Sequence, residues 1–70
     1  MMNNVMNEYF CTTASSHQEG SGYYKVIATD VLQARLAVHK HTNGKWSFLY
    51  KSLEDVHPLD RKCHGVLHGD

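Results

Sequence analysis

The sequence predicts an α+β domain of two layers, in which a three-stranded sheet carries one helix on one face. Three observations support this class. Two short segments with strand composition come first, a segment with helix start and stop signals follows, and a segment that alternates aromatic with other residues comes next. The predicted order is β-β-α-β followed by a C-terminal tail. A chain of 70 residues has room for one such domain, which we place at residues 7–70, with residues 1–6 as a loose leader.

The first two predicted strands form a hairpin. The segments "NEYFCTTA" (7–14) and "YYKVIA" (23–28) are rich in aromatic and β-branched residues, which fit a pleated sheet. Between them, "SSHQEGSG" (15–22) is polar and contains two glycines, which predicts a loop.

The segment "TDVLQARLAVHKHTNG" (29–44) predicts the helix. Asp30 can cap its first turn, with Gln33 three residues later, as in a capping box. Asn43 and Gly44 supply a left-handed end. Both helix ends are therefore predicted from local chemistry.

The segment "KWSFLY" (45–50) predicts a third strand, because its residues alternate and its aromatic side chains share one face. In the tail, Ser52 begins one predicted helical turn, which Pro58 limits. The segment "GVLH" (65–68) is a candidate short edge strand.

Chirality rules predict how the sheet closes. Strands that are joined through a helix run parallel with a right-handed crossover, so the strands at 23–28 and 45–50 should be parallel. The first strand then lies between them and antiparallel to both, which gives the order 2-1-3. The side chains expected to face the helix are Trp46, Phe48, Tyr50, Tyr24, Val26 and Phe10.

Two apolar surfaces remain after this packing. One is the uncovered sheet face, and the other is a second helix stripe that contains Leu32 and Leu36, opposite the stripe that contains Ala34 and Val38. Such surfaces either bind a partner or a second copy, or are covered by the tail. The uncovered sheet face is predicted to carry Tyr23, Lys25, Ile27, Lys45, Ser47, Leu49 and Lys51, and the tail residues available for covering are Leu53, Val56, Leu59, Val66 and Leu67.

A cluster of metal-ligand residue types lies at residues 57–68. His57, Cys63, His64 and His68 occur there, but only His64 and His68 have the spacing of a zinc-ligand pair. Because a matching short-spaced cysteine pair is missing from the sequence, we assign no metal and no cofactor.

Catalysis is not predicted either. No nucleophile motif surrounds Cys63, and no glycine-rich phosphate loop follows a predicted strand. A chain of this length seldom forms a deep pocket that excludes water. We therefore expect a protein that is not an enzyme.

Charge is distributed unevenly although the formal net charge is zero. The middle of the chain, residues 25–51, is basic, and both ends are acidic. A basic region favours acidic partners. Because no leader of the secretory type and no membrane-spanning run are evident, the expected location is the cytoplasm, away from membranes.

The stretch "YYKVIATDVLQARLAVHKHTNGKWSFLY" (23–50) resembles small phage-encoded proteins that block host machinery, such as RNA-polymerase inhibitors and anti-CRISPR proteins. The likeness lies in the order of elements and in the Thr-Asp helix start. It implies a non-enzymatic inhibitor that acts by occupying a surface of a host protein or defence complex. It assigns no residue a role.

The leading interpretation is therefore a protein-interaction module, and more narrowly an inhibitor of this phage type. The alternative is a small nucleic-acid-binding module that uses the basic and aromatic sheet face. A homodimer is also compatible with the leftover surfaces. The residues predicted to bind a partner are Leu32, Arg35 and Leu36 on the helix, and Tyr23, Lys25 and Lys51 on the sheet.

Overall fold

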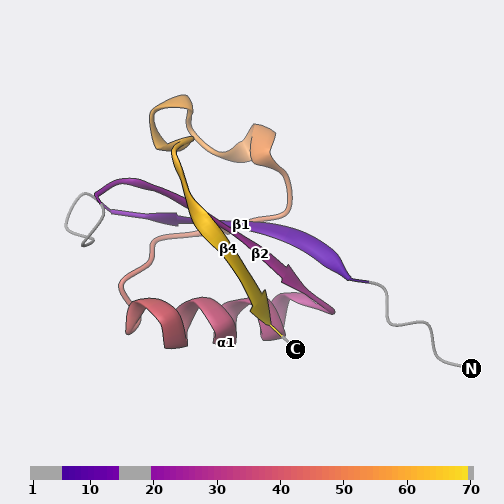
Figure 1. Cartoon of the computed structure of the whole chain (residues 1–70). Coiled ribbons are helices and arrows are strands. Elements are labelled where there is room, and N and C mark those ends of the chain that lie inside the picture. The colour runs from indigo at the N-terminus through magenta and orange to yellow at the C-terminus, as the bar shows by residue number, and fades with distance from the viewer. Residues whose placement is uncertain (1–5, 15–19, 70) are drawn as a thin grey trace, which may run out of the picture.

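A mixed four-stranded sheet is packed against a helix on one face (Figure 1). The computed structural model describes residues 6–14 and 20–69. The elements in chain order are β1 (Asn7–Thr13), β2 (Gly22–Ala28), α1 (Val31–Thr42), β3 (Leu49–Tyr50), the 3-10 helices η1 (Leu53–Asp55) and η2 (Pro58–Asp60), and β4 (Cys63–Gly69).

The strand order is β3-β1-β2-β4. Strand β1 is antiparallel to β2 and to β3, whereas β4 is parallel to β2. The α+β class is therefore confirmed. The prediction of three strands is wrong, because the tail adds β4 beside β2 and the order of the whole sheet differs; within it, the three predicted strands keep the relative order 2-1-3. The candidate edge strand at 65–68 is real and longer than predicted.

Helix α1 begins and ends as its local chemistry predicts. The Asp30 carboxylate accepts a hydrogen bond of 2.9 Å from the Gln33 N–H at the first turn. Asn43 adopts a left-handed conformation with φ of 56°, and the Gly44 N–H donates to the His39 carbonyl at 3.0 Å. The chain thus leaves the helix in a tight turn.

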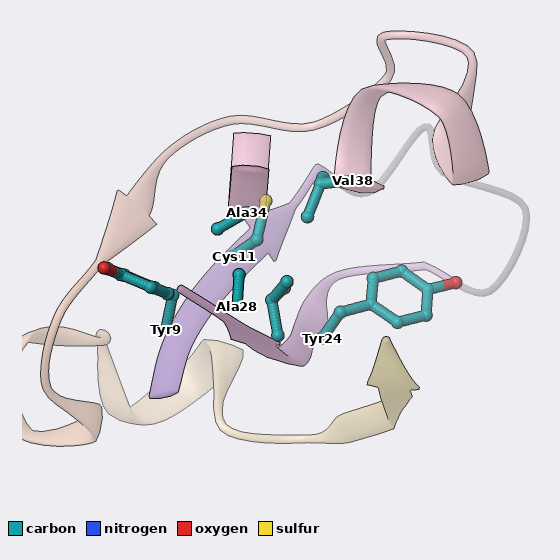
Figure 2. Close-up of a cluster of buried hydrophobic side chains, with 7 residues drawn as sticks. Tyr9, Cys11, Tyr24, Ala28, Ala34 and Val38 are labelled. Carbon is teal, nitrogen blue, oxygen red and sulfur yellow. The ribbon is translucent and has the colours of Figure 1, made fainter. Parts of the chain in front are cut away.

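The core lies between α1 and the sheet. Figure 2 shows small and aromatic side chains from β1, β2 and α1 meeting there. Val26, Ala34 and Val38 are fully buried. Partly buried Ala37, Trp46, Leu49 and Leu67 pack around them. The buried cluster consists of Tyr9, Cys11, Tyr24, Val26, Ala28, Ala34 and Val38.

Three aromatic residues that were predicted to face the helix do not. Phe48 is 64% exposed. Phe10 and Tyr50 are partners in the β1–β3 register, and Phe10 also pairs with Lys25 of β2, so both aromatics lie on the sheet face opposite α1. We call this face the open face. Tyr24 and Val26 do lie in the core, as predicted.

For Phe10 the reason is the β1–β2 register, which pairs it with Lys25 between the core-facing Tyr24 and Val26. For Phe48 and Tyr50 the reason is an irregularity in the segment 45–50. Ser47 and Phe48 exchange backbone hydrogen bonds with Thr12, each of 2.8 Å, but the regular strand comprises Leu49 and Tyr50 only. Trp46 and Leu49 both pack against the core, three residues apart. A slip of one residue moves every later side chain to the other face of a sheet. Lys45 and Ser47 therefore lie outside the strand, and Leu49 leaves the open face.

The tail passes over the open face before it forms β4. Figure 1 shows η1 and η2 on the side of the sheet away from α1. Val56, between them, is 1% exposed, and its carbonyl accepts a 3.0 Å hydrogen bond from Arg61 Nε. Leu59 is 82% exposed, whereas Leu67 packs against the core from β4. The tail thus covers part of the sheet and leaves the leucine stripe of α1 bare.

Two sequence predictions concern residues outside the described ranges in part. The leader prediction falls on residues 1–6, of which Met6 alone is described, as an exposed residue before β1. The loop prediction at 15–22 falls mostly on residues 15–19. Among the described residues, no helix is long and apolar enough to cross a membrane.

Candidate protein-binding surface on helix α1

A shallow depression of about 370 Å³ lies on the outer side of α1. We call it the leucine groove. It combines two exposed leucines, two basic side chains from the same helix and one tryptophan from the segment that follows it. Its lining residues are Leu32, Arg35, Leu36, His39 and Trp46.

The helix exposes its larger apolar side chains and buries its smaller ones. Leu32 is 60% and Leu36 is 55% exposed, whereas Ala34 and Val38 have no accessible surface. Leu32, Leu36 and His39 follow the i, i+4, i+7 spacing that places side chains along one side of a helix. Two large apolar groups therefore stand in solvent beside one another.

Trp46 forms one wall of the groove. The turn at Asn43 and Gly44 returns the chain alongside α1, so the indole packs partly on the core. The Arg35 guanidinium carbon lies 5.9 Å from the centre of the Trp46 ring, within the range of a cation–π contact. This contact holds the Arg35 side chain at the edge of the groove.

Arg35 and His39 are the basic residues that line the groove, and none of its lining residues is acidic. The sequence of α1 contains no Asp or Glu, while Arg35, His39 and Lys40 lie on or next to the groove. Asp30, the nearest acidic residue in the sequence, is engaged in the N-terminal cap. A carboxylate brought to this surface would meet favourable charge.

The three other predicted partner-binding residues lie elsewhere, on or next to the sheet. Lys25 forms an ion pair of 3.2 Å with Glu8. Tyr23 is half-buried and packs edge-on against Phe10, with ring centres 5.8 Å apart. Lys51 is exposed just after β3. The six predicted residues thus belong to two separate surfaces, of which the leucine groove unites three.

Tyr23 also faces Cys63 of β4. Partial burial raises the pKa of the Tyr23 hydroxyl, and its hydrogen bond and charge interaction with the Cys63 thiol raise that pKa further. The Tyr23 hydroxyl is therefore a hydrogen-bonding partner of Cys63 on the open face.

The histidines near the C-terminus have separate surroundings. His57 Nδ1 accepts a 3.1 Å hydrogen bond from the Leu59 N–H and caps η2. His64 Nε2 lies 3.0 Å from Thr13 Oγ1, and its ring is 5.1 Å from that of Tyr24. His68 is exposed on β4. In residues 6–14 and 20–69, no three His, Cys, Asp or Glu side chains are grouped to hold a metal ion.

Trp46 packs partly against the core, as predicted, but it also lines the groove with His39, and neither residue was predicted to belong to a partner-binding surface. The helix stop at Asn43 and Gly44 was the available signal, since a tight turn brings the next residues back beside the helix that they leave.

The comparisons with known proteins add no relative. No family model, no curated protein and no solved structure matches the chain.

Proposed function

We propose that this protein is a non-enzymatic interaction module that binds another protein through the leucine groove. The observation that carries the proposal is the pair of exposed leucines, 60% and 55% accessible, beside Arg35 and Trp46. Interface hot spots combine apolar anchors with Trp and Arg, at sites that the partner can seal from water. The groove offers these groups on a rigid, capped helix.

The charge of the groove defines the partner's chemistry. A segment with apolar side chains flanked by carboxylates would fill the space between Leu32 and Leu36 and neutralise Arg35. We further propose that the bound partner is a host protein that is thereby inhibited. This last step rests on the resemblance of residues 23–50 to phage-encoded inhibitors.

An affinity pull-down from bacterial lysate tests the proposal, with nuclease-treated and untreated halves read by mass spectrometry. The wild-type chain should retain a stoichiometric protein in both halves, and the Leu32→Asp/Leu36→Asp variant should lose it. Leu59→Asp is the matched control, because Leu59 is 82% exposed and lies in η2, away from the groove. Circular dichroism establishes that each variant is folded.

Three results would count against the proposal. Retention of the same protein by the groove variant would exclude the groove as its binding site. Loss of that protein from Leu59→Asp as well would show that added charge, not the groove, is responsible. Recovery of nucleic acid, or of proteins that disappear after nuclease treatment, would favour the nucleic-acid alternative, whose affinity should also fall steeply with salt.

A further inference from the structure

Strand β4 is the longer of the two edges of the sheet. It ends the order β3-β1-β2-β4 and has seven residues, whereas β3 at the opposite edge has two. Figure 1 shows β4 in front of the sheet, with no described element lying across it. An edge strand presents a row of N–H and C=O groups that another strand can pair with.

The direction of the β4 backbone groups follows from one hydrogen bond. The Tyr23 N–H donates to the Lys62 carbonyl at 2.8 Å, so Tyr23 directs its backbone groups toward β4. Successive residues of a strand direct their N–H and C=O groups to opposite sides, so Lys25 and Ile27, two and four residues after Tyr23, also direct theirs toward β4. In a parallel pair of strands, a residue that directs its backbone groups toward the neighbouring strand lies opposite a residue whose N–H and C=O point away from it. Val66 and His68 are opposite Lys25 and Ile27, and therefore point their N–H and C=O outward.

The composition of β4 leaves this edge unprotected. Natural edge strands are commonly blunted by lysine, proline or inward-pointing charge. Residues 63–69, "CHGVLHG", contain no Lys, Arg, Asp, Glu or Pro. The irregularity in the β2–β4 register lies near the start of β4, so the part from Gly65 to Gly69 is regular. Val66 is 51% exposed in the middle of this part.

A second copy of β4 fits this edge. Antiparallel pairing about a two-fold axis at Val66 would place each Val66 opposite its counterpart, where the outward N–H of each donates to the carbonyl of the other. Residues directly opposite share a face, so the two half-exposed Val66 side chains would meet. Residues 63–69 contain no Lys, Arg, Asp or Glu that could meet a like charge, and the pairing places His64 of each copy opposite His68 of the other. Such an isologous contact closes at two subunits.

We propose that the protein dimerises by antiparallel pairing of β4 with β4 of a second copy, which joins the two sheets into one. This dimer goes beyond the proposed function. It uses the β4 edge, so either proposal can fail without the other.

Sedimentation equilibrium over a wide concentration range tests the dimer. The wild-type chain should reach about twice its 8.0 kDa mass. Val66→Lys and Val66→Glu should each be monomeric over the same range, with association weakened at least about tenfold, because like charges directly opposite on paired strands repel. Mixing the two variants should restore a heterodimer. Leu59→Lys, a charge on an exposed leucine of η2, should leave the dimer intact.

The mixing experiment separates pairing at Val66 from general damage to the fold, because a misfolded variant would not be rescued by its opposite charge. A wild-type mass of 8.0 kDa at every concentration overturns the proposal. Dimers that persist in both charged variants, or variants that stay monomeric when mixed, overturn the pairing about Val66.

Discussion

Truncating the leucines of α1 should cost the fold less than truncating a smaller residue on the opposite side of the same helix. Leu32 and Leu36 keep 60% and 55% of their surface in the folded chain. Full burial of a leucine stabilises by roughly 1.5–3 kcal/mol, so the buried remainder contributes about 1 kcal/mol each. Alanine recovers a few tenths of a kcal/mol through its higher helix propensity. Leu32→Ala and Leu36→Ala should each destabilise by less than about 1 kcal/mol.

Val38→Ala should be the more damaging change. Val38 has no accessible surface, and the variant loses two buried methyl groups at about 0.8 kcal/mol each plus the cost of the cavity. We expect a loss of about 2–3 kcal/mol from a total that, for 70 residues, is about 4–10 kcal/mol.

Urea denaturation followed by far-UV circular dichroism gives the free energies of unfolding of the wild-type chain and of the three variants. Circular dichroism is preferred because Trp46 lines the groove, so its fluorescence would respond to the leucine changes directly. An equal denaturant slope in all variants would establish that the differences are differences in stability. A leucine variant that loses more than Val38→Ala would show that the leucines belong to the core, and the binding surface would then be wrongly assigned.

Four further predictions test the cap, the two cysteines, the pH dependence of stability and the close approach of Gly69 in β4 to α1. Asp30→Ala removes the acceptor of the Gln33 N–H and should cost about 1 kcal/mol, measured by thermal denaturation. A thiol reagent should label Cys63 alone in the folded chain and both cysteines in denaturant, since burial raises the pKa of Cys11 to about 12. Because the pKa of Cys11 is higher in the folded chain than in the unfolded chain, the free energy of unfolding should fall as pH rises from 9 toward 12. Cys11→Ala should remove the contribution of Cys11 to this pH dependence. Gly69→Ala would place a Cβ 2.6 Å from the Gln33 carbonyl oxygen. The variant should lose about 1–3 kcal/mol of unfolding free energy, measured by urea denaturation. A loss below about 0.5 kcal/mol, which is typical of an exposed substitution, would show that β4 moves away from α1 freely.

The parts of the fold that depend on neighbouring residues were predictable. Asp30 and Gln33 define the helix start, and Asn43 with Gly44 defines its end, because capping is settled within one turn of chain. The hairpin of β1 and β2 was predictable for the same reason, since both strands carry their own composition signal.

The parts that depend on distant backbone were predictable only in part. Residues 65–68 were a candidate edge strand, but neither the length of β4 nor its place beside β2 was predicted. Strand β4 forms by hydrogen bonds to β2, and backbone pairing requires no apolar periodicity in a segment such as "CHGVLHG". The slip between Trp46 and Leu49 depends on Thr12, whose side-chain hydroxyl accepts a 3.3 Å hydrogen bond from the Phe48 N–H. The sequence of 45–50 alone does not indicate that its hydrogen-bonding partner is Thr12 of β1.

The exposure of the leucines follows from how closely α1 approaches the sheet. Ala28 of β2 and Ala34 of α1 are fully buried, and at Gly69 of β4 even an added methyl group would lie 2.6 Å from the helix backbone. A helix turned to bury Leu32 and Leu36 would bring branched four-carbon side chains into a space that alanine and glycine now fill. Overpacking of that kind costs about 1–3 kcal/mol for each misplaced side chain. The fold therefore selects the small stripe for its core and leaves Leu32 and Leu36 exposed, so the proposed binding surface requires no rearrangement of the helix.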